Sequence, residues 1–222
     1  MSFAAAKLPP LGAPPARSRL RSPKGLATAL TVLLGLCAAT RLLAVAAGVN
    51  RYLALDSFTE FMRAGSSSQL VYMSMSLVLM AMVPTAVVFI VWFHRVRVNA
   101  DVYAAGTFRG GPGWAIGMWF VPAVGWTVLP CLTALKVWAA SAARLSGTAA
   151  LASAVPVVAW SGTFGAAMLA SAGAGRLEGA AVGQSELRDA VLAAAASDLL
   201  FAVAAVLAVV FVRRLSAMQS AA

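Results

Sequence analysis

The sequence predicts an all-α, polytopic integral membrane protein that forms one helical bundle over residues 25–214. Hydrophobic residues make up 61% of the 222 positions and charged residues only 11%, whereas soluble domains carry about 25% charged residues. Long apolar stretches cover residues 26–49, 70–93, 151–172 and 190–212. Each is as long as a helix must be to cross roughly 30 Å of hydrocarbon. We therefore expect four transmembrane helices, with a further apolar segment at residues 114–146.

The two ends of the chain fall outside these spans. Residues 1–24 are rich in proline, alanine, serine and arginine, a composition that predicts a disordered basic tail. Residues 215–222 are expected to form a short C-terminal tail. Basic residues without acidic ones precede the first span, and the positive-inside bias therefore predicts a cytoplasmic N-terminus. These basic residues are Lys7, Arg17, Arg19, Arg21 and Lys24.

The connection after the first span, residues 50–69, has no net charge and suits the outer side of the membrane. Within it, Phe58, Phe61 and Met62 share one face of a helical pattern. This spacing predicts a short helix lying on the outer membrane surface.

The apolar segment 114–146 is interrupted by Pro122, Gly125 and Pro130. It either crosses the membrane, giving five spans, or enters and returns on the same side, because proline kinks or ends a helix. Four crossings put the later basic residues on the side of the basic N-terminus, as the positive-inside bias requires, and five crossings put them opposite. These residues are Lys136, Arg144, Arg213 and Arg214. We favour four spans with a re-entrant or interfacial segment, and five spans remain the alternative.

Two ionisable residues fall inside predicted spans, Arg41 in the first and Asp198 in the last. A charge at such depth costs at least about 2.5 kcal/mol on insertion scales, so each should seek a partner. With four crossings the two residues lie at similar depth. We therefore predict an Arg41–Asp198 ion pair, acting either as a structural clamp or as a gate or polar site. Alternatively, Arg41 extends outward to the interface.

Residues 89–126 combine an apolar helix end, a basic turn, a glycine-rich loop and the start of the interrupted segment. This stretch resembles the bacterial membrane-protein family catalogued as domain of unknown function 4328. The matching positions are Trp92, Arg95, Asn99, Gly113, Trp114, Trp119, Pro122, Pro130 and Trp138. The resemblance implies a multi-pass protein of the bacterial cytoplasmic membrane and no particular activity.

Several of these positions have a physical interpretation of their own. Trp92 and Trp114 are expected at the inner membrane interface, where aromatic residues gather. Asn99 is expected to cap the chain where it leaves the second span. Basic side chains around this exit are expected to contact lipid phosphates or a partner's acidic groups, namely Arg95, Arg97 and Arg109.

No combination of residues in the sequence identifies a substrate or a reaction. His94 is the only histidine, and neither Cys37 nor Cys131 has a second ligand at metal-binding spacing. We expect no metal, no cofactor and no enzymatic activity. The leading hypothesis is a protein that acts through helix packing, lipid contact or a partner protein. The alternatives are a small-solute or ion transporter using the interrupted segment with Arg41 and Asp198, and a membrane enzyme acting on lipids.

The net charge of +10 lies beside the apolar spans rather than on a polar face. The expected partners are therefore anionic lipid headgroups on the cytoplasmic side, together with a protein partner or a second copy of the chain, and not nucleic acid.

Overall fold

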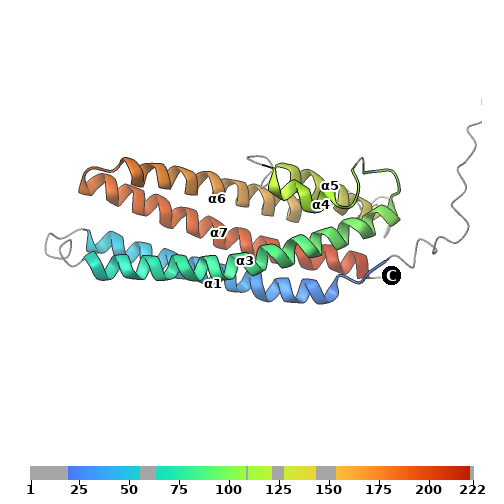
Figure 1. Ribbon diagram of the computed structural model, residues 1–222, viewed down its shortest axis with the longest axis horizontal. Coiled ribbons are helices and arrows are strands. Elements are labelled where there is room, and N and C mark those ends of the chain that lie inside the picture. Colours follow the sequence, from blue (N-terminus) through green and yellow to red (C-terminus); the bar gives the residue numbers. More distant parts are fainter. Residues whose placement is uncertain (1–19, 56–63, 109, 122–127, 144–153, 221–222) are drawn as a thin grey trace, which may run out of the picture.

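The computed structural model describes residues 20–55, 64–108, 110–121, 128–143 and 154–220, and these residues are almost entirely helical (Figure 1). The long helices are α1 (Lys24–Ala54), α3 (Ala64–Tyr103), α6 (Val155–Ala180) and α7 (Gln184–Ser220). All four are long and apolar enough to cross a membrane. The chain is therefore an all-α, multi-pass membrane protein, as the sequence predicted.

The long helices extend beyond the predicted apolar spans. Helix α3 continues past the predicted end at Phe93 to Tyr103, because no glycine or proline occurs between Phe93 and Gly106. Gly106 has a φ of 83°, in the left-handed region that glycine adopts easily and that stops a helix. At the other end of the chain, α7 runs through most of the segment expected to be a C-terminal tail. Leu215, Ser216 and Gln219 in this part of α7 are buried, and their packing keeps the segment helical.

Helix α6 begins at Val155 rather than at residue 151, and Pro156 occupies its first turn. Proline is tolerated there because the first turn has no intrahelical partner for its backbone nitrogen. Pro130 is likewise in the first turn of α5 (Val128–Ala143) and does not interrupt that helix. The expected surface helix with Phe58, Phe61 and Met62, and the break at Pro122 and Gly125, lie outside the described residues.

The described parts of the segment between α3 and α6 lie at one end of the bundle (Figure 1). It contains α4 (Trp114–Gly117), the 3-10 helix η2 (Met118–Phe120) and α5. The end of α3 and the start of α6 lie at the same end of the molecule, together with the start of α1 and the end of α7. We call this the terminal end, and the opposite end, where α1 ends and α7 begins, the distal end. The chain thus leaves and re-enters the bundle on one side, as four crossings require.

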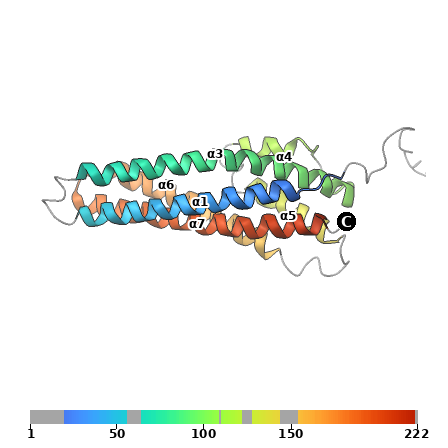
Figure 2. The same cartoon turned by 90° about the horizontal axis from the view of Figure 1, so that it is seen from below.

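The four long helices pack in a row rather than in a closed square. Helix α6 packs on α7, α7 on α1, and α1 on α3, whereas α3 and α6 touch through the rings of Phe89 and Trp160 but their backbones hardly approach each other. Figure 2 shows α1 lying between α3 and α7. In the terminal half, α5 contacts α3, α6 and α7 and so fills the space between them. Among the described residues, no additional helix fills the distal half in this way.

The outer faces of the long helices expose many large apolar side chains. Examples are Val32 at 68% exposure, Met80 at 73% and Leu169 at 77%. In water, such a continuous apolar surface would be unfavourable, whereas in a membrane it contacts lipid chains.

Candidate functional site

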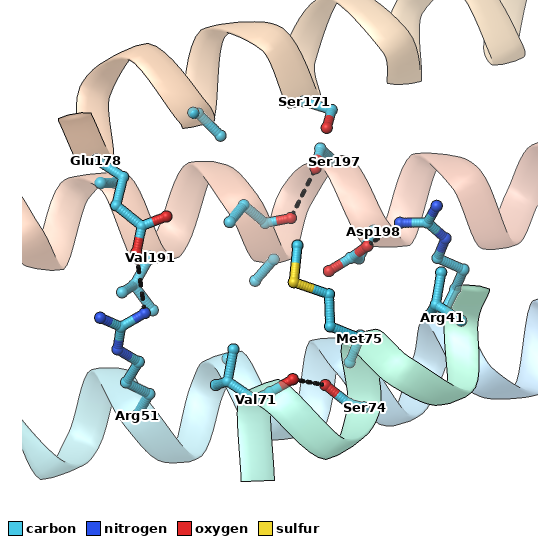
Figure 3. A pocket seen from close by; sticks show the side chains of 18 of the residues that line it. Arg41, Arg51, Val71, Ser74, Met75, Ser171, Glu178, Val191, Ser197 and Asp198 are labelled. Atoms are coloured by element: carbon cyan, nitrogen blue, oxygen red, sulfur yellow. Dashed lines mark hydrogen bonds and ion pairs between the residues drawn. The ribbon is translucent and has the colours of Figure 1, made fainter. Parts of the chain in front are cut away.

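A pocket of about 300 Å³ lies between α1, α3, α6 and α7 in the distal half of the bundle (Figure 3). Much of its wall consists of small residues, which leave space between helices that large side chains would fill. They include Ala44, Gly48, Ala174, Gly175, Ala194 and Ala195. At the floor of the pocket α1 and α7 approach closely, since a Cβ at Gly48 would lie 3.3 Å from the Cβ of Ala195. Small residues permit such approaches between membrane helices.

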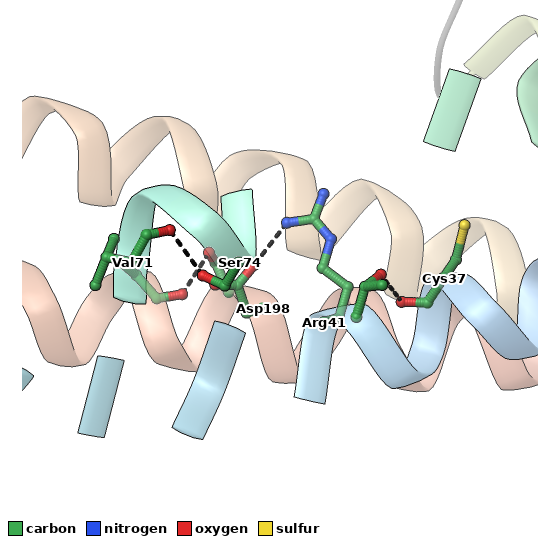
Figure 4. Close-up of polar contacts among 8 residues, drawn as sticks. Cys37, Arg41, Val71, Ser74 and Asp198 are labelled. Carbon is green, nitrogen blue, oxygen red and sulfur yellow. Dashed lines mark hydrogen bonds and ion pairs between the residues drawn. The ribbon is translucent and has the colours of Figure 1, made fainter. Parts of the chain in front are cut away.

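The Arg41–Asp198 ion pair forms part of the pocket wall (Figure 4). Nη1 of Arg41 donates to Oδ1 of Asp198 at 2.5 Å, and 20% of each side chain is exposed. The guanidinium also lies 4.2 Å from the ring centre of Phe201, a favourable cation–π position. The two charges that the sequence places at similar depth are therefore in direct contact, midway along α1 and α7.

A second ion pair lies on the distal side of the pocket. Nη1 of Arg51 donates to Oε1 of Glu178 at 3.1 Å and links the end of α1 to the end of α6. Ten residues of α1 separate Arg41 from Arg51, a rise of about 15 Å along the helix. Sequence reasoning missed this pair because Arg51 and Glu178 lie outside the predicted spans, where a charged side chain needs no partner. The only signal was that both residues adjoin the same predicted side of the membrane.

Serine hydroxyls add neutral polar groups to the wall. Ser74 donates to the carbonyl of Val71 and Ser197 to that of Ala194, each at 2.8 Å. Both serines are buried. A hydroxyl that donates to its own helix still has lone pairs with which to accept a hydrogen bond.

Asn99 has a different role from the predicted cap. Because α3 continues to Tyr103, Asn99 lies within the helix and is only 2% exposed. Its side-chain oxygen accepts from the backbone nitrogen of Arg21 at 3.2 Å, and its amide nitrogen donates to the carbonyl of Arg21 at 2.9 Å. The same nitrogen donates to Oε1 of Gln219, whose own amide donates to the carbonyl of Val96. Asn99 thus fastens the segment before α1 to the terminal ends of α3 and α7.

Trp92 also differs from its predicted place at the membrane interface. It is fully buried and donates from Nε1 to the hydroxyl of Ser216 at 3.0 Å. It belongs to an aromatic cluster in which Trp160 stacks on Phe211 with ring centres 5.0 Å apart. The interface position was wrong because α7 covers this face of α3. Trp138, at 4% exposure, stacks on Phe211 from α5.

The other family-like positions lie around this cluster. Trp119 packs edge-on against Phe89 with ring centres 5.6 Å apart. Trp114 is 51% exposed, and Gly113 directly precedes α4. Most of these positions therefore build the terminal half of the bundle, away from the pocket. Pro122 lies outside the described residues.

The three arginines expected to face lipid phosphates differ in their surroundings. Arg97 is only 3% exposed, so the expectation was wrong for this residue. It bonds to the carbonyl of Gly110 at 3.0 Å and pairs with Asp101 one helical turn later, because the glycine-rich loop folds over it. Arg95 is partly exposed and donates to the carbonyl of Ser22 at 3.2 Å. Arg109 lies outside the described residues.

The pocket lies apart from the histidine and from the described part of the interrupted segment. Across the described part of the chain, no three His, Cys, Asp or Glu side chains gather as metal ligands would. His94 contacts the carbonyl of Pro112 at the terminal end, far from the pocket. None of the described residues of α4, η2 or α5 lines the pocket, so these parts of the interrupted segment lie apart from the Arg41–Asp198 pair.

Comparison with known proteins gives one match. No curated protein and no solved structure matches the chain. The family described as "Domain of unknown function (DUF4328)" matches residues 55–217, which include Asn99, the aromatic cluster and Asp198 but neither α1 nor Arg41. The match covers well over half of the sequence, and the chain therefore belongs to the DUF4328 family.

Proposed function

We propose that this protein is a non-enzymatic membrane protein that binds a polar or amphiphilic ligand in the pocket between α1, α3, α6 and α7. The single observation that carries the proposal is the incomplete pairing of Arg41 with Asp198. Their contact joins one nitrogen to one oxygen, whereas a guanidinium has five N–H donors and a carboxylate can accept about four hydrogen bonds. At membrane depth the unused capacity is costly, and a ligand in the adjoining pocket would satisfy it.

The proposal extends to orientation and lipid contact. The terminal end carries Arg21, Lys24, Arg95, Arg213 and Arg214. Under the positive-inside bias this end faces the cytoplasm, where anionic headgroups attract basic side chains. The pocket then opens in the outer half of the membrane.

A pocket-filling substitution tests the proposal. Gly175 lines the pocket, and a Cβ there would meet nothing within 4 Å, so the first atom of a larger side chain displaces no neighbour and Gly175→Leu is designed to occupy the pocket. Gly173 is the matched control, because it lies on the same helix at similar depth, has no atom within 4 Å of an added Cβ and does not line the pocket. Thermal unfolding is measured in detergent with and without a polar lipid extract of the expression host.

If the extract supplies a pocket ligand at about 100 times its Kd, the ligand stabilises the native protein and Gly173→Leu by about 3 kcal/mol, which raises Tm by roughly 6 to 12 °C. The Tm of Gly175→Leu should rise little when the extract is added. Equal stabilisation of both variants contradicts the proposal. Turnover of any lipid in the extract that Asp198→Ala abolishes contradicts its non-enzymatic part.

A further inference from the structure

We infer that the pocket holds the headgroup of a zwitterionic phospholipid that carries a phosphate and a primary ammonium, and that this lipid enters sideways between α3 and α6. This inference rests on the proposed binding function and specifies its ligand. Three features support it: the charge balance of the lining, the position of hydrogen-bonding groups around Asp198, and the packing order of the helices.

The charged residues that line the pocket are balanced. They are two arginines, Arg41 and Arg51, and two carboxylates, Asp198 and Glu178. A purely anionic ligand would approach two carboxylates, and a purely cationic ligand would approach two arginines, so either would meet repulsion as well as attraction. A zwitterion can place each of its charges beside an opposite charge in the wall.

The groups around the deeper ion pair suit an ammonium that donates hydrogen bonds. Among the described residues Asp198 has no side-chain partner other than Arg41, so its second oxygen is available to the pocket. Ser74 and Ser197 line the same pocket and retain acceptor lone pairs. Arg41 contributes N–H donors beside them, and guanidinium groups bind phosphate well.

The packing order gives the route of entry. Helices α1 and α7 pack on each other and form the floor, while α3 and α6 line opposite walls. The backbones of α3 and α6 hardly approach each other, and their ring contact between Phe89 and Trp160 lies in the terminal half, away from the pocket. In Figure 3, α6 runs along the top, α7 across the middle and α3 in front of α1 below. Two lining residues of α3, Tyr72 and Met75, are also 68% and 61% exposed, so they reach the outer surface of the bundle. The pocket is therefore accessible to the lipid phase, and acyl chains can remain outside while the headgroup enters.

The lipid-retention test uses the full chain in nanodiscs of defined composition. The nanodiscs contain equal parts of phosphatidylethanolamine, phosphatidylcholine and phosphatidylglycerol. Lipids that remain bound after transfer to detergent are identified by native mass spectrometry. We expect phosphatidylethanolamine to be retained above the other two, because the quaternary ammonium of phosphatidylcholine has no N–H to donate and phosphatidylglycerol has no cation. Gly175→Leu should reduce its occupancy by about tenfold or more, and Gly173→Leu should leave it unchanged.

Other outcomes separate the inference from the proposed function. Retention of phosphatidylglycerol or phosphatidylcholine in preference, with the same sensitivity to Gly175→Leu, overturns the zwitterionic ammonium ligand and leaves a binding pocket. Water-soluble glycerophosphoethanolamine is added in a second arm. If it binds in a Gly175-dependent way while no lipid does, the source is a free solute and the lipid inference is wrong. If Gly175→Leu changes the retention of no lipid and no solute, both the inference and the proposed function are wrong.

Discussion

Breaking the Arg41–Asp198 pair should destabilise the protein far more than breaking the Arg51–Glu178 pair. The first pair is four-fifths buried at each side chain, with a nitrogen–oxygen distance of 2.5 Å, whereas Glu178 is 53% exposed. Removing one partner of a buried pair leaves an uncompensated charge, at a cost of about 3 to 5 kcal/mol. The pocket gives this pair some access to polar surroundings. We therefore expect Arg41→Met or Asp198→Leu alone to lower the free energy of unfolding by about 3 kcal/mol, at the lower end of this range.

A double-mutant cycle isolates the interaction between the two residues. The double variant Arg41→Met/Asp198→Leu leaves no charge behind. Its decrease in the free energy of unfolding should be smaller than the sum of the decreases in the two single variants by about 2 kcal/mol or more. This coupling corresponds to a factor of roughly 30 in the unfolding equilibrium. The matched cycle with Arg51→Met and Glu178→Leu should give a coupling below about 1 kcal/mol, because exposed pairs contribute little.

Reversible unfolding in mixed micelles, followed by tryptophan fluorescence, provides the free energies for both cycles. The reasoning fails if the decreases in unfolding free energy caused by Arg41→Met and Asp198→Leu simply add in the double variant. It also fails if the exposed pair couples as strongly as the buried one, since burial would then not determine the strength of the interaction.

Three further predictions test other parts of the structure. Asn99→Leu removes the hydrogen bonds to the backbone of Arg21, so trypsin should cleave after Arg21 several times faster than in the native protein, and an unchanged rate would show that this contact does not hold the segment. Gly48→Val forces α1 away from α7 where an added Cβ would lie 3.3 Å from Ala195, and it should lower the free energy of unfolding by about 1 to 3 kcal/mol, whereas a stability equal to that of the native protein would show that α1 can shift without cost. In a background with both native cysteines replaced by alanine, Val182→Cys and Ser220→Cys should react with a membrane-impermeant thiol reagent from opposite sides, and labelling from the same side would contradict the number of crossings.

Hydropathy and charge revealed those parts of the structure that depend on one segment at a time. The four spans follow from the lengths of their apolar runs, and Arg41 and Asp198 were found because each interrupts such a run at a definite depth. Their contact could be anticipated because four crossings fix the direction of the first and last helices.

The predictions that failed depend on contacts between segments distant in sequence. Trp92 and Arg97 adjoin a basic helix exit, a pattern typical of the membrane interface, but α7 covers Trp92 and the glycine-rich loop covers Arg97. Asn99 binds the backbone of a residue 78 positions away. Local patterns carry no information about such coverage, because it depends on how the helices pack.

The hydrogen bonds of Asn99 have a consequence for how the start of the chain tolerates change. They reach main-chain atoms of Arg21, and every amino acid except proline presents the same nitrogen and oxygen. Substitution of the side chain at position 21, or addition of a tag or reporter before this position, therefore leaves the two hydrogen bonds to Asn99 possible. Only a proline at position 21 would remove one of the two hydrogen bonds, because proline has no backbone N–H to donate to Oδ1 of Asn99.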